Sequence, residues 1–404
     1  MWDNLAAMIG LKGLVLAVKN ALDRLAASRQ PNTGELSLDS VEWGDMSLKD
    51  VDAGHSDLWA EYFHGEGAAI VARQGLEEQV QAWRTGLKER LEILFSATPQ
   101  FGGADAPPSH VVPPALLKLL ARRNNTFKDF ETGYATLASL GDPNIRLSEL
   151  SHIITENKHL TAMLLKCVNS PYFGLRGEVS SIPTAILILG LVNLRNVVYR
   201  DHMVKLVDIE DPRLKQFFNQ VWEHLTFTSV CCSHVARAFD EVNPTTLFTM
   251  GLLHDIGRFV IATSPLVDRD EDQTLAYDLC FSIEDENDLF GINHAEAGRL
   301  VAGQLRFPPR IAMAVEHHHA AAWTDRSALG LDLSAQKYLA ALFLADKLAG
   351  VFSCGAEEPV DPLHVSFHSL VDRQRLEKIV LHPSLARDIK KAQEMALRNF
   401  DAPG

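Results

Sequence analysis

From residue 114 onwards the sequence is a succession of short segments in which apolar residues recur every three or four positions. This spacing places apolar side chains on one face of a helix, and turn-forming residues such as Gly141-Asp142-Pro143 separate the segments. Alternating patterns typical of half-buried strands are scarce. The sequence therefore predicts an all-α fold. The first predicted helices of this region cover residues 114–122, 128–140, 147–156, 159–169, 184–189 and 192–207.

Proline and glycine are dense between Phe101 and Pro114, and they remove helix-forming capacity over about a dozen residues. We therefore predict a domain boundary near residue 110. Residues 1–110 are expected to form a helical accessory region that contains an acidic, glycine-interrupted segment at 35–66. That segment fits either a solvated, loosely structured stretch or an acidic docking surface for a partner.

Composition narrows the classes of partner and the compartment. The net charge of −14 argues against non-specific binding of nucleic acid. The first helical pattern, residues 2–25, contains charged residues and no uncharged run long enough to span a membrane, so we expect neither a signal peptide nor a membrane anchor. The five cysteines show no C-x-x-C spacing, which favours free thiols in a reducing cytoplasm.

Side chains that commonly bind metals lie on the apolar faces of five predicted helices. A single histidine on such a face is usually a hydrogen-bonded core residue. Burying unpaired polar groups on five helices in succession costs free energy, however, and a shared cation would satisfy all of them together. Mixed imidazole and carboxylate ligands suit Fe, Mn, Zn or Ni better than Ca or Mg. The residues are His224, His254 with Asp255, His294, His318 and Asp346.

Two segments, Leu164–Gly174 and Ser181–Gly190, resemble the signature of the HDOD family, the HD-related output domains of bacterial signalling proteins. The His-Asp turn, the His294 helix and the histidine run follow in that family's order. The resemblance implies an all-α, multi-helix HDOD domain, which we place at residues 111–352. Residues 353–404 would then be a short helical extension that packs on the domain or mediates self-association.

The order of the polar residues also resembles the HD superfamily of metal-dependent phosphohydrolases. Thirty residues separate His224 from His254, and Asp346 closes the series. This resemblance implies that one cation is held by His224, His254, Asp255 and Asp346. It further implies that a second cation is allowed by the extra histidines of the HD-GYP branch, here His294, His317 and His318.

In a hydrolase of this type Asp255 would bridge or orient the nucleophile, and Arg258 would clamp a phosphate oxygen. The chain departs from active HD-GYP proteins at three places. Arg258 stands where they have lysine, and the two side chains are not equivalent. Gln220 stands where they have an acid, and Ala320–Trp323 follow the histidine run where they have a Gly-Tyr-Pro loop.

Two functions follow from these patterns. The HDOD family is regarded as a non-hydrolytic output module, so we favour a cytoplasmic regulatory protein that binds a signalling partner or a small phosphorylated ligand. The alternative is a metal-dependent phosphohydrolase acting on a nucleotide, a cyclic nucleotide or another phosphate ester. P-loop, nucleophile-elbow and zinc-finger motifs are absent from the sequence.

Overall fold

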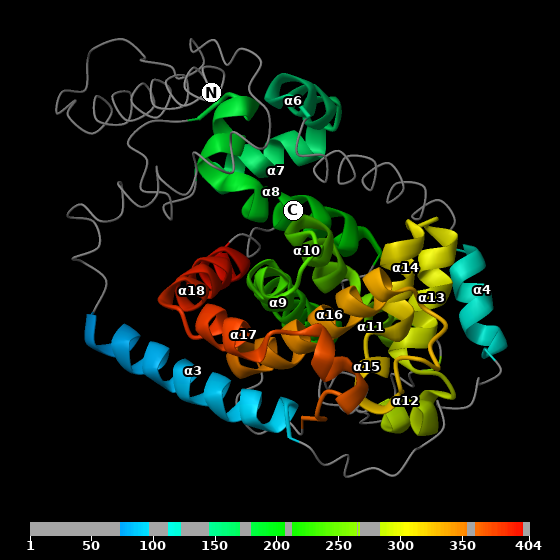
Figure 1. The fold of residues 1–404 in the computed structure, drawn as a ribbon. Helices are drawn as coiled ribbons and strands as arrows, with labels where there is room; N and C mark the ends of the chain where they lie inside the picture. The colour runs from blue at the N-terminus through cyan, green and yellow to red at the C-terminus, as the bar shows by residue number, and fades with distance from the viewer. Residues whose placement is uncertain are drawn as a thin grey trace, which may run out of the picture. The chain divides into compact units, whose positions relative to one another are not determined.

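In the computed structural model the described residues are 73–96, 112–122, 145–169, 179–206, 212–264, 266, 283–353 and 360–398. Their regular elements are helices, which confirms the predicted all-α class (Figure 1). Four predicted features lie wholly or mostly outside these residues: the helix in 1–30, the acidic segment 35–66, the linker 101–114 and the helix 128–140.

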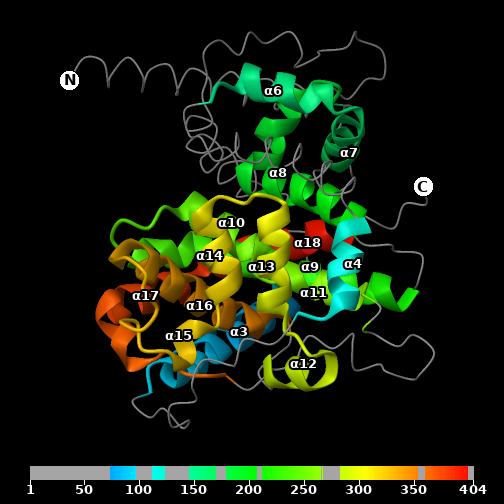
Figure 2. The same cartoon turned by 90° about the vertical axis from the view of Figure 1, so that its right-hand side faces the viewer.

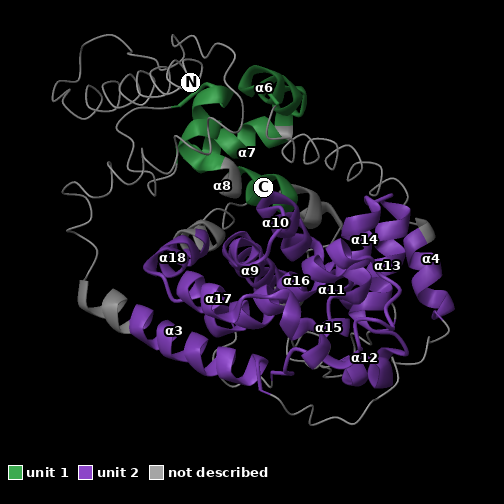
Figure 3. Cartoon of the chain, in the orientation of Figure 1, with its two compact units in different colours: residues 1–76, 133–201 green, residues 77–132, 202–404 purple. Residues whose placement is uncertain are grey.

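Contacts within the chain divide it into two compact units (Figure 3). One comprises Met1–Leu76 and Gly133–Asp201, and the other comprises Glu77–Thr132 and His202–Gly404. All the residues of the candidate site belong to the second unit. The predicted division at residues 110 and 352 stays a prediction.

The first unit contains α6 (Leu147–Glu156), α7 (Lys158–Val168) and most of α8 (Ile182–Leu206). Asn157 separates α6 from α7, and its side chain accepts a hydrogen bond from the backbone nitrogen of Leu160 at 3.0 Å. Asn169 ends α7, and its side chain bonds both backbone polar groups of Val179. The two asparagines therefore fix where these short helices begin and end.

The second unit is built around α9 (Pro212–Val235), which packs against α10 (Pro244–Leu253), α16 (Leu333–Ser353) and α18 (Pro383–Arg398). A second row is formed by α11 (Ile256–Ala262), α13 (His294–Gln304) and α14 (Pro309–His317), which pack in that order (Figure 2). The remaining elements are α3 (Arg73–Leu94), α4 (Pro114–Arg122), η4 (Ala236–Ala238), α12 (Ile283–Phe290), α15 (Ala320–Trp323), η6 (Val365–Leu370) and α17 (Arg373–Val380).

The C-terminal helices pack on the rest of this unit. Helix α18 lies against α9, where the Nε2 of His234 is 3.1 Å from Oδ2 of Asp388. Helix α3 also joins the unit, because Arg90 donates from Nη1 to the carbonyl oxygen of Lys347 at 2.8 Å. Helices α17 and α18 thus pack on α9, and the two roles expected for residues 353–404 stay predictions.

Helices α11 and α13 approach each other so closely that their contact requires glycine. A Cβ atom on Gly257 would collide with the backbone of His294 and of Gly298. Gly298 faces Gly257 across the contact, and a Cβ there would press on Val315. The absence of side chains at these positions lets the turn after α10 lie directly against the first residue of α13.

No single helix in the described part of the chain has the length and apolar character needed to cross a membrane. A bent pair, Ile182–Gly190 with Leu194–Arg200, meets that length and composition requirement only when the two are taken together.

Candidate metal centre

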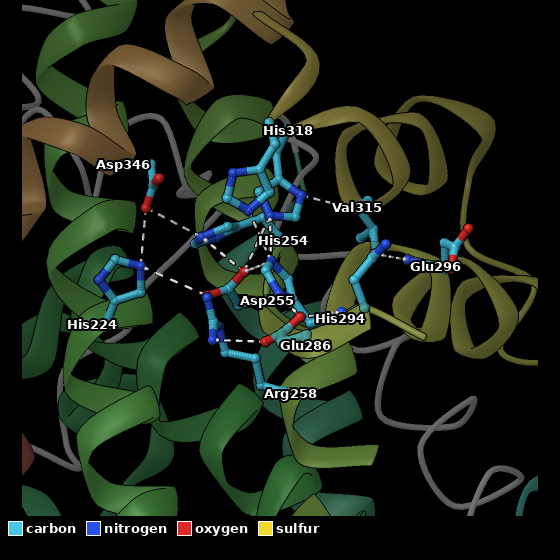
Figure 4. A network of polar contacts seen from close by, with 12 residues as sticks. His224, His254, Asp255, Arg258, Glu286, His294, Glu296, Val315, His318 and Asp346 are labelled. Carbon is cyan, nitrogen blue, oxygen red and sulfur yellow. Dashed lines mark hydrogen bonds and ion pairs between the residues drawn. The ribbon is translucent and has the colours of Figure 1, made fainter. Parts of the chain in front are cut away.

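The structure brings together six of the seven predicted metal ligands and adds one residue that was not predicted (Figure 4). These residues fall into two groups, and within each group the ligand atoms lie within 4.8 Å of one another. We call the seven residues together the cluster. The first group is Asp255, His294, His318 and His319, and the second is His224, His254 and Asp346.

The His-Asp pair occupies the turn between α10 and α11. His254 is buried, and its Nδ1 donates to the carbonyl oxygen of Gly251 at 2.9 Å. Because a carbonyl oxygen can only accept, Nδ1 carries a proton, and Nε2 is the nitrogen turned toward the carboxylates. That Nε2 lies 3.5 Å from Oδ1 of Asp255 and 3.4 Å from Oδ1 of Asp346.

Two further histidines are oriented in the same way. The Nδ1 of His318 donates to the carbonyl oxygen of Val315 at 2.9 Å, and the Nδ1 of His294 lies 2.6 Å from Oε2 of Glu286. In both rings Nε2 is turned toward Asp255 and lies 3.2 Å from its Oδ1. Three imidazole nitrogens thus surround one carboxylate oxygen, which is buried and has no hydrogen-bond partner.

The contacts between the histidines themselves also require a shared proton or a cation. Nε2 of His294 lies 2.9 Å from Nε2 of His319 and 3.2 Å from Nε2 of His318. Two nitrogen lone pairs repel at such distances unless a proton or a cation lies between them. A transition-metal ion would satisfy these nitrogens together with Oδ1 of Asp255, so the donor set of this first group fits a metal.

The second group differs because it is satisfied in part without a metal. Nε2 of His224 lies 3.0 Å from Oδ1 of Asp346, within hydrogen-bond distance. Oδ2 of Asp255 faces this group at 3.9 Å from the same nitrogen. Oδ1 of Asp255 therefore faces histidines of both groups, whereas Oδ2 accepts from Arg258. The arrangement has donors for one or two ions.

The charges of the cluster suit a cation. Burial opposes ionisation of Asp255, but Arg258, His254 and His294 together hold the pKa of its carboxyl well below the usual range. Burial lowers the pKa of His318 to about 4, and with the neighbouring His318 and His294 it holds the pKa of His319 well below the usual value. Both rings are therefore neutral near pH 7, which is the form that binds metals.

The structure corrects the expectation for His317. Its ring is at the end of α14, is about one third exposed, and lies 3.9 Å from Glu316 instead of in the cluster. His319 joins the cluster in its place. Helix α14 ends at His317, and His318 and His319 both lie in the turn before α15. His318 keeps a right-handed helical backbone, so the spacing extrapolated from α14 still places it.

Arg258 is also placed differently from the predicted phosphate clamp. Its Nε donates to Oδ2 of Asp255 at 2.8 Å, and its Nη1 donates to Oε1 of Glu286 at 3.1 Å. The guanidinium is buried between the two carboxylates, which raise the pKa of Arg258 although burial opposes its charge. This arginine serves as an internal counter-ion of the cluster.

The sequence analysis did not find Glu286, which supports the cluster from α12. One of its oxygens accepts from Arg258, and the other accepts from both the backbone nitrogen and Nδ1 of His294. A carboxylate behind a metal-binding imidazole fixes the ring and raises its basicity. One feature of the sequence indicates that Glu286 is buried: it shares a helix face with Ile283 and Phe290 in an otherwise acidic segment.

The family model for the HDOD domain matches residues 133–321. An uncharacterised protein of Treponema pallidum (strain Nichols) is 24% identical over 188 residues, which are 45% of this chain and 35% of that protein. The aligned part therefore spans about a third of the length of this curated relative.

Solved structures of low sequence identity also match. An HDOD domain protein of unknown function from Geobacter sulfurreducens is 20% identical, with a TM-score of 0.46 over 70% of this chain and 100% of that one. A candidate phosphohydrolase from Shewanella amazonensis SB2B is 20% identical, with a TM-score of 0.42 over 70% and 96%. A candidate signal transduction protein from Marinobacter aquaeolei VT8 is 15% identical, with a TM-score of 0.44 over 78% and 65%.

Proposed function

We propose that this chain, whose residues 133–321 match the family model for the HDOD domain, is a regulatory protein of signal transduction. Its HDOD domain would bind a signalling partner or a small phosphorylated ligand, and its cluster would hold one or two divalent transition-metal ions.

The observation that most strongly supports a metal site is the environment of Asp255. Its Oδ1 is buried, has no hydrogen-bond partner and is surrounded by three imidazole nitrogens at 3.2, 3.2 and 3.5 Å. Leaving a buried carboxylate oxygen unpaired is costly. An ion of Fe, Mn, Zn or Ni held by the first group would supply a Lewis acid at this point.

Three features favour regulation over hydrolysis. Arg258 is tied to two carboxylates and does not point at a ligand. Gln220, at the position where active HD-GYP proteins have an acid, is exposed. The chain continues after His319 as a short helix, Ala320–Trp323, instead of the Gly-Tyr-Pro loop.

The alternative, a metal-dependent phosphohydrolase, is favoured by one specific observation. Five helices or helix ends deliver nitrogen and oxygen ligands, and Oδ1 of Asp255 faces histidines of both groups. In that case the carboxylate of Asp255 would orient the attacking water.

Elemental analysis of the full chain, purified without chelator, tests the proposal. We expect one or two equivalents of a transition metal, lost in Asp255→Asn and kept in Asp325→Asn, a control at an exposed aspartate outside the cluster. A parallel screen with phosphomonoester and phosphodiester substrates in Mn²⁺ and Fe²⁺ should show no turnover. Turnover that Asp255→Asn abolishes while the fold is kept would establish the hydrolase instead. Absence of metal would contradict both.

A further inference from the structure

The cluster needs a basic group if it is to bind an anionic ligand, and Arg258 does not provide one. Its Nε donates to Asp255 at 2.8 Å, and its Nη1 donates to Glu286 at 3.1 Å. Turning the guanidinium toward a ligand would leave two buried carboxylates without their counter-ion, which is strongly unfavourable.

In the part of the chain that the structure describes, a second basic side chain reaches the cluster. The Nζ of Lys347 lies 3.2 Å from Oδ2 of Asp346. Its charge also contributes to lowering the pKa of His319, behind burial and the two neighbouring histidines. Lys347 therefore contacts the carboxylate of the second group, and its charge acts on a histidine of the first.

Lys347 and His224 both contact Asp346, and their side chains are each 13% exposed. Those of His254, His294 and His318 are at most 1% exposed. A ligand that approaches beside Asp346 therefore meets Lys347 and His224 before it meets these three histidines.

The chemistry of Lys347 suits an exchange of partners. An ammonium group has three donors on a flexible stem, and it binds phosphate as a point charge. The carbonyl oxygen of Lys347 is held by Arg90, so the backbone stays in place if the side chain moves. A cation bound by Asp346 and its histidines would neutralise that carboxylate and weaken its hold on Lys347.

From this geometry we infer that the ammonium group of Lys347 binds a phosphate oxygen of the ligand at the metal-loaded cluster, in the place that the sequence assigned to Arg258. The inference rests on the proposed function, since it requires a phosphorylated ligand. The ligand class is a phosphate group with at least one free anionic oxygen, close enough to contact both the metal and Lys347.

The test uses the full chain loaded with Mn²⁺ and inorganic phosphate as the probe. Paramagnetic relaxation of the phosphorus signal reports phosphate close to the metal, and a separate Mn²⁺ titration reports the affinity for the ion. We expect Lys347→Met to weaken phosphate binding about tenfold or more, the loss expected for one charge-assisted hydrogen bond, with Mn²⁺ affinity unchanged or raised because the ammonium no longer competes for Asp346. Lys347→Arg should restore part of the binding.

Lys337→Met is the matched control. Lys337 lies on the same helix, is 15% exposed and pairs with a carboxylate, Glu241, at 2.9 Å, but it is outside the cluster. The Lys337→Met variant should bind phosphate with the affinity of the unsubstituted chain. Unchanged phosphate affinity in Lys347→Met, or a loss that only follows a loss of Mn²⁺, would overturn the inference.

Different results would contradict the metal site and the role of Lys347. A chain that binds no Mn²⁺ in the titration contradicts the metal site itself. A chain that binds Mn²⁺ but no phosphate, measured by calorimetry on the same sample, overturns the role of Lys347 and leaves the metal site standing.

Discussion

Glu286 holds His294 at two points: one carboxylate oxygen lies 2.6 Å from Nδ1 of the ring and 2.7 Å from the backbone nitrogen. The same residue therefore sets the orientation of the imidazole and caps the first turn of α13. Since His294 is in contact with His318, His319 and Asp255, its orientation affects the whole first group.

Glu286→Gln should lower the affinity for the metal about 10- to 100-fold, the usual cost of losing a carboxylate behind a metal-binding histidine. Glutamine has the same size, so the fold should be kept. Competition with a coloured chelator measures the affinity, and circular dichroism checks the fold. Glu284→Gln, an exposed position on the same helix, is the control. Equal affinities for the two variants would show that Glu286 does not position His294.

Gly257→Ala should destabilise the protein, because its Cβ would collide with backbone atoms of His294 and Gly298. Overpacking of this kind costs about 1–3 kcal/mol. Gly303→Ala is the comparison, since nothing lies within 4 Å of a Cβ built there and alanine favours the helix. Urea unfolding of both variants gives the free energies. The contact between α11 and α13 would be wrongly described if Gly257→Ala were as stable as Gly303→Ala.

Arg258→Lys should lower the free energy of unfolding by about 3 kcal/mol, because one ammonium cannot replace a guanidinium that joins two buried carboxylates. The exposed pair of Arg375 and Asp240 offers the comparison. Arg375→Lys should change stability by less than about 1 kcal/mol. If Arg258→Lys instead left stability intact and weakened phosphate binding, the arginine would be the phosphate clamp after all.

The stability of the metal-free protein should fall as the pH is lowered from about 6.5 toward 4. Burial lowers the pKa of His318 to about 4, whereas the unfolded chain takes up the proton near 6.5. Protons therefore bind the unfolded state first in this window, and folding loses free energy. His254 and His294, whose pKa values are raised, act in the opposite direction above pH 6.5.

Unfolding at several pH values, in chelator, measures this effect. His318→Gln should reduce the slope of stability against pH between about 6.5 and 4. Equal slopes would mean that His318 is not held neutral by burial.

Much of the site could be predicted from the sequence because helical periodicity fixes which side chains face the core. His224, His294 and Asp346 lie on regular helices, and His254 and His318 are the first residues after α10 and α14, where the backbone is still helical. The structure brings these residues together. His319 was missed because it lies outside the helical spacing of Ile311, Ala314, Val315 and His318.

The other differences depend on side-chain geometry between elements far apart in the sequence. The sequence and the structure both place Arg258 close to the cluster. Only the position of Glu286 on α12 shows that its guanidinium donates to a carboxylate of the protein. Lys347 follows Asp346 in the chain, and its proximity to His319 depends on how α15 packs against α16. Patterns within one helix do not contain that information.

The most direct test of the central claim is a crystal structure of the chain purified without chelator, with anomalous diffraction recorded at the absorption edge of the metal found by elemental analysis. The account predicts a peak among Nε2 of His294, His318 and His319 and Oδ1 of Asp255, at about 2.0–2.2 Å from these atoms. A map with no peak there, in which these nitrogens are joined by protons or water alone, would contradict it.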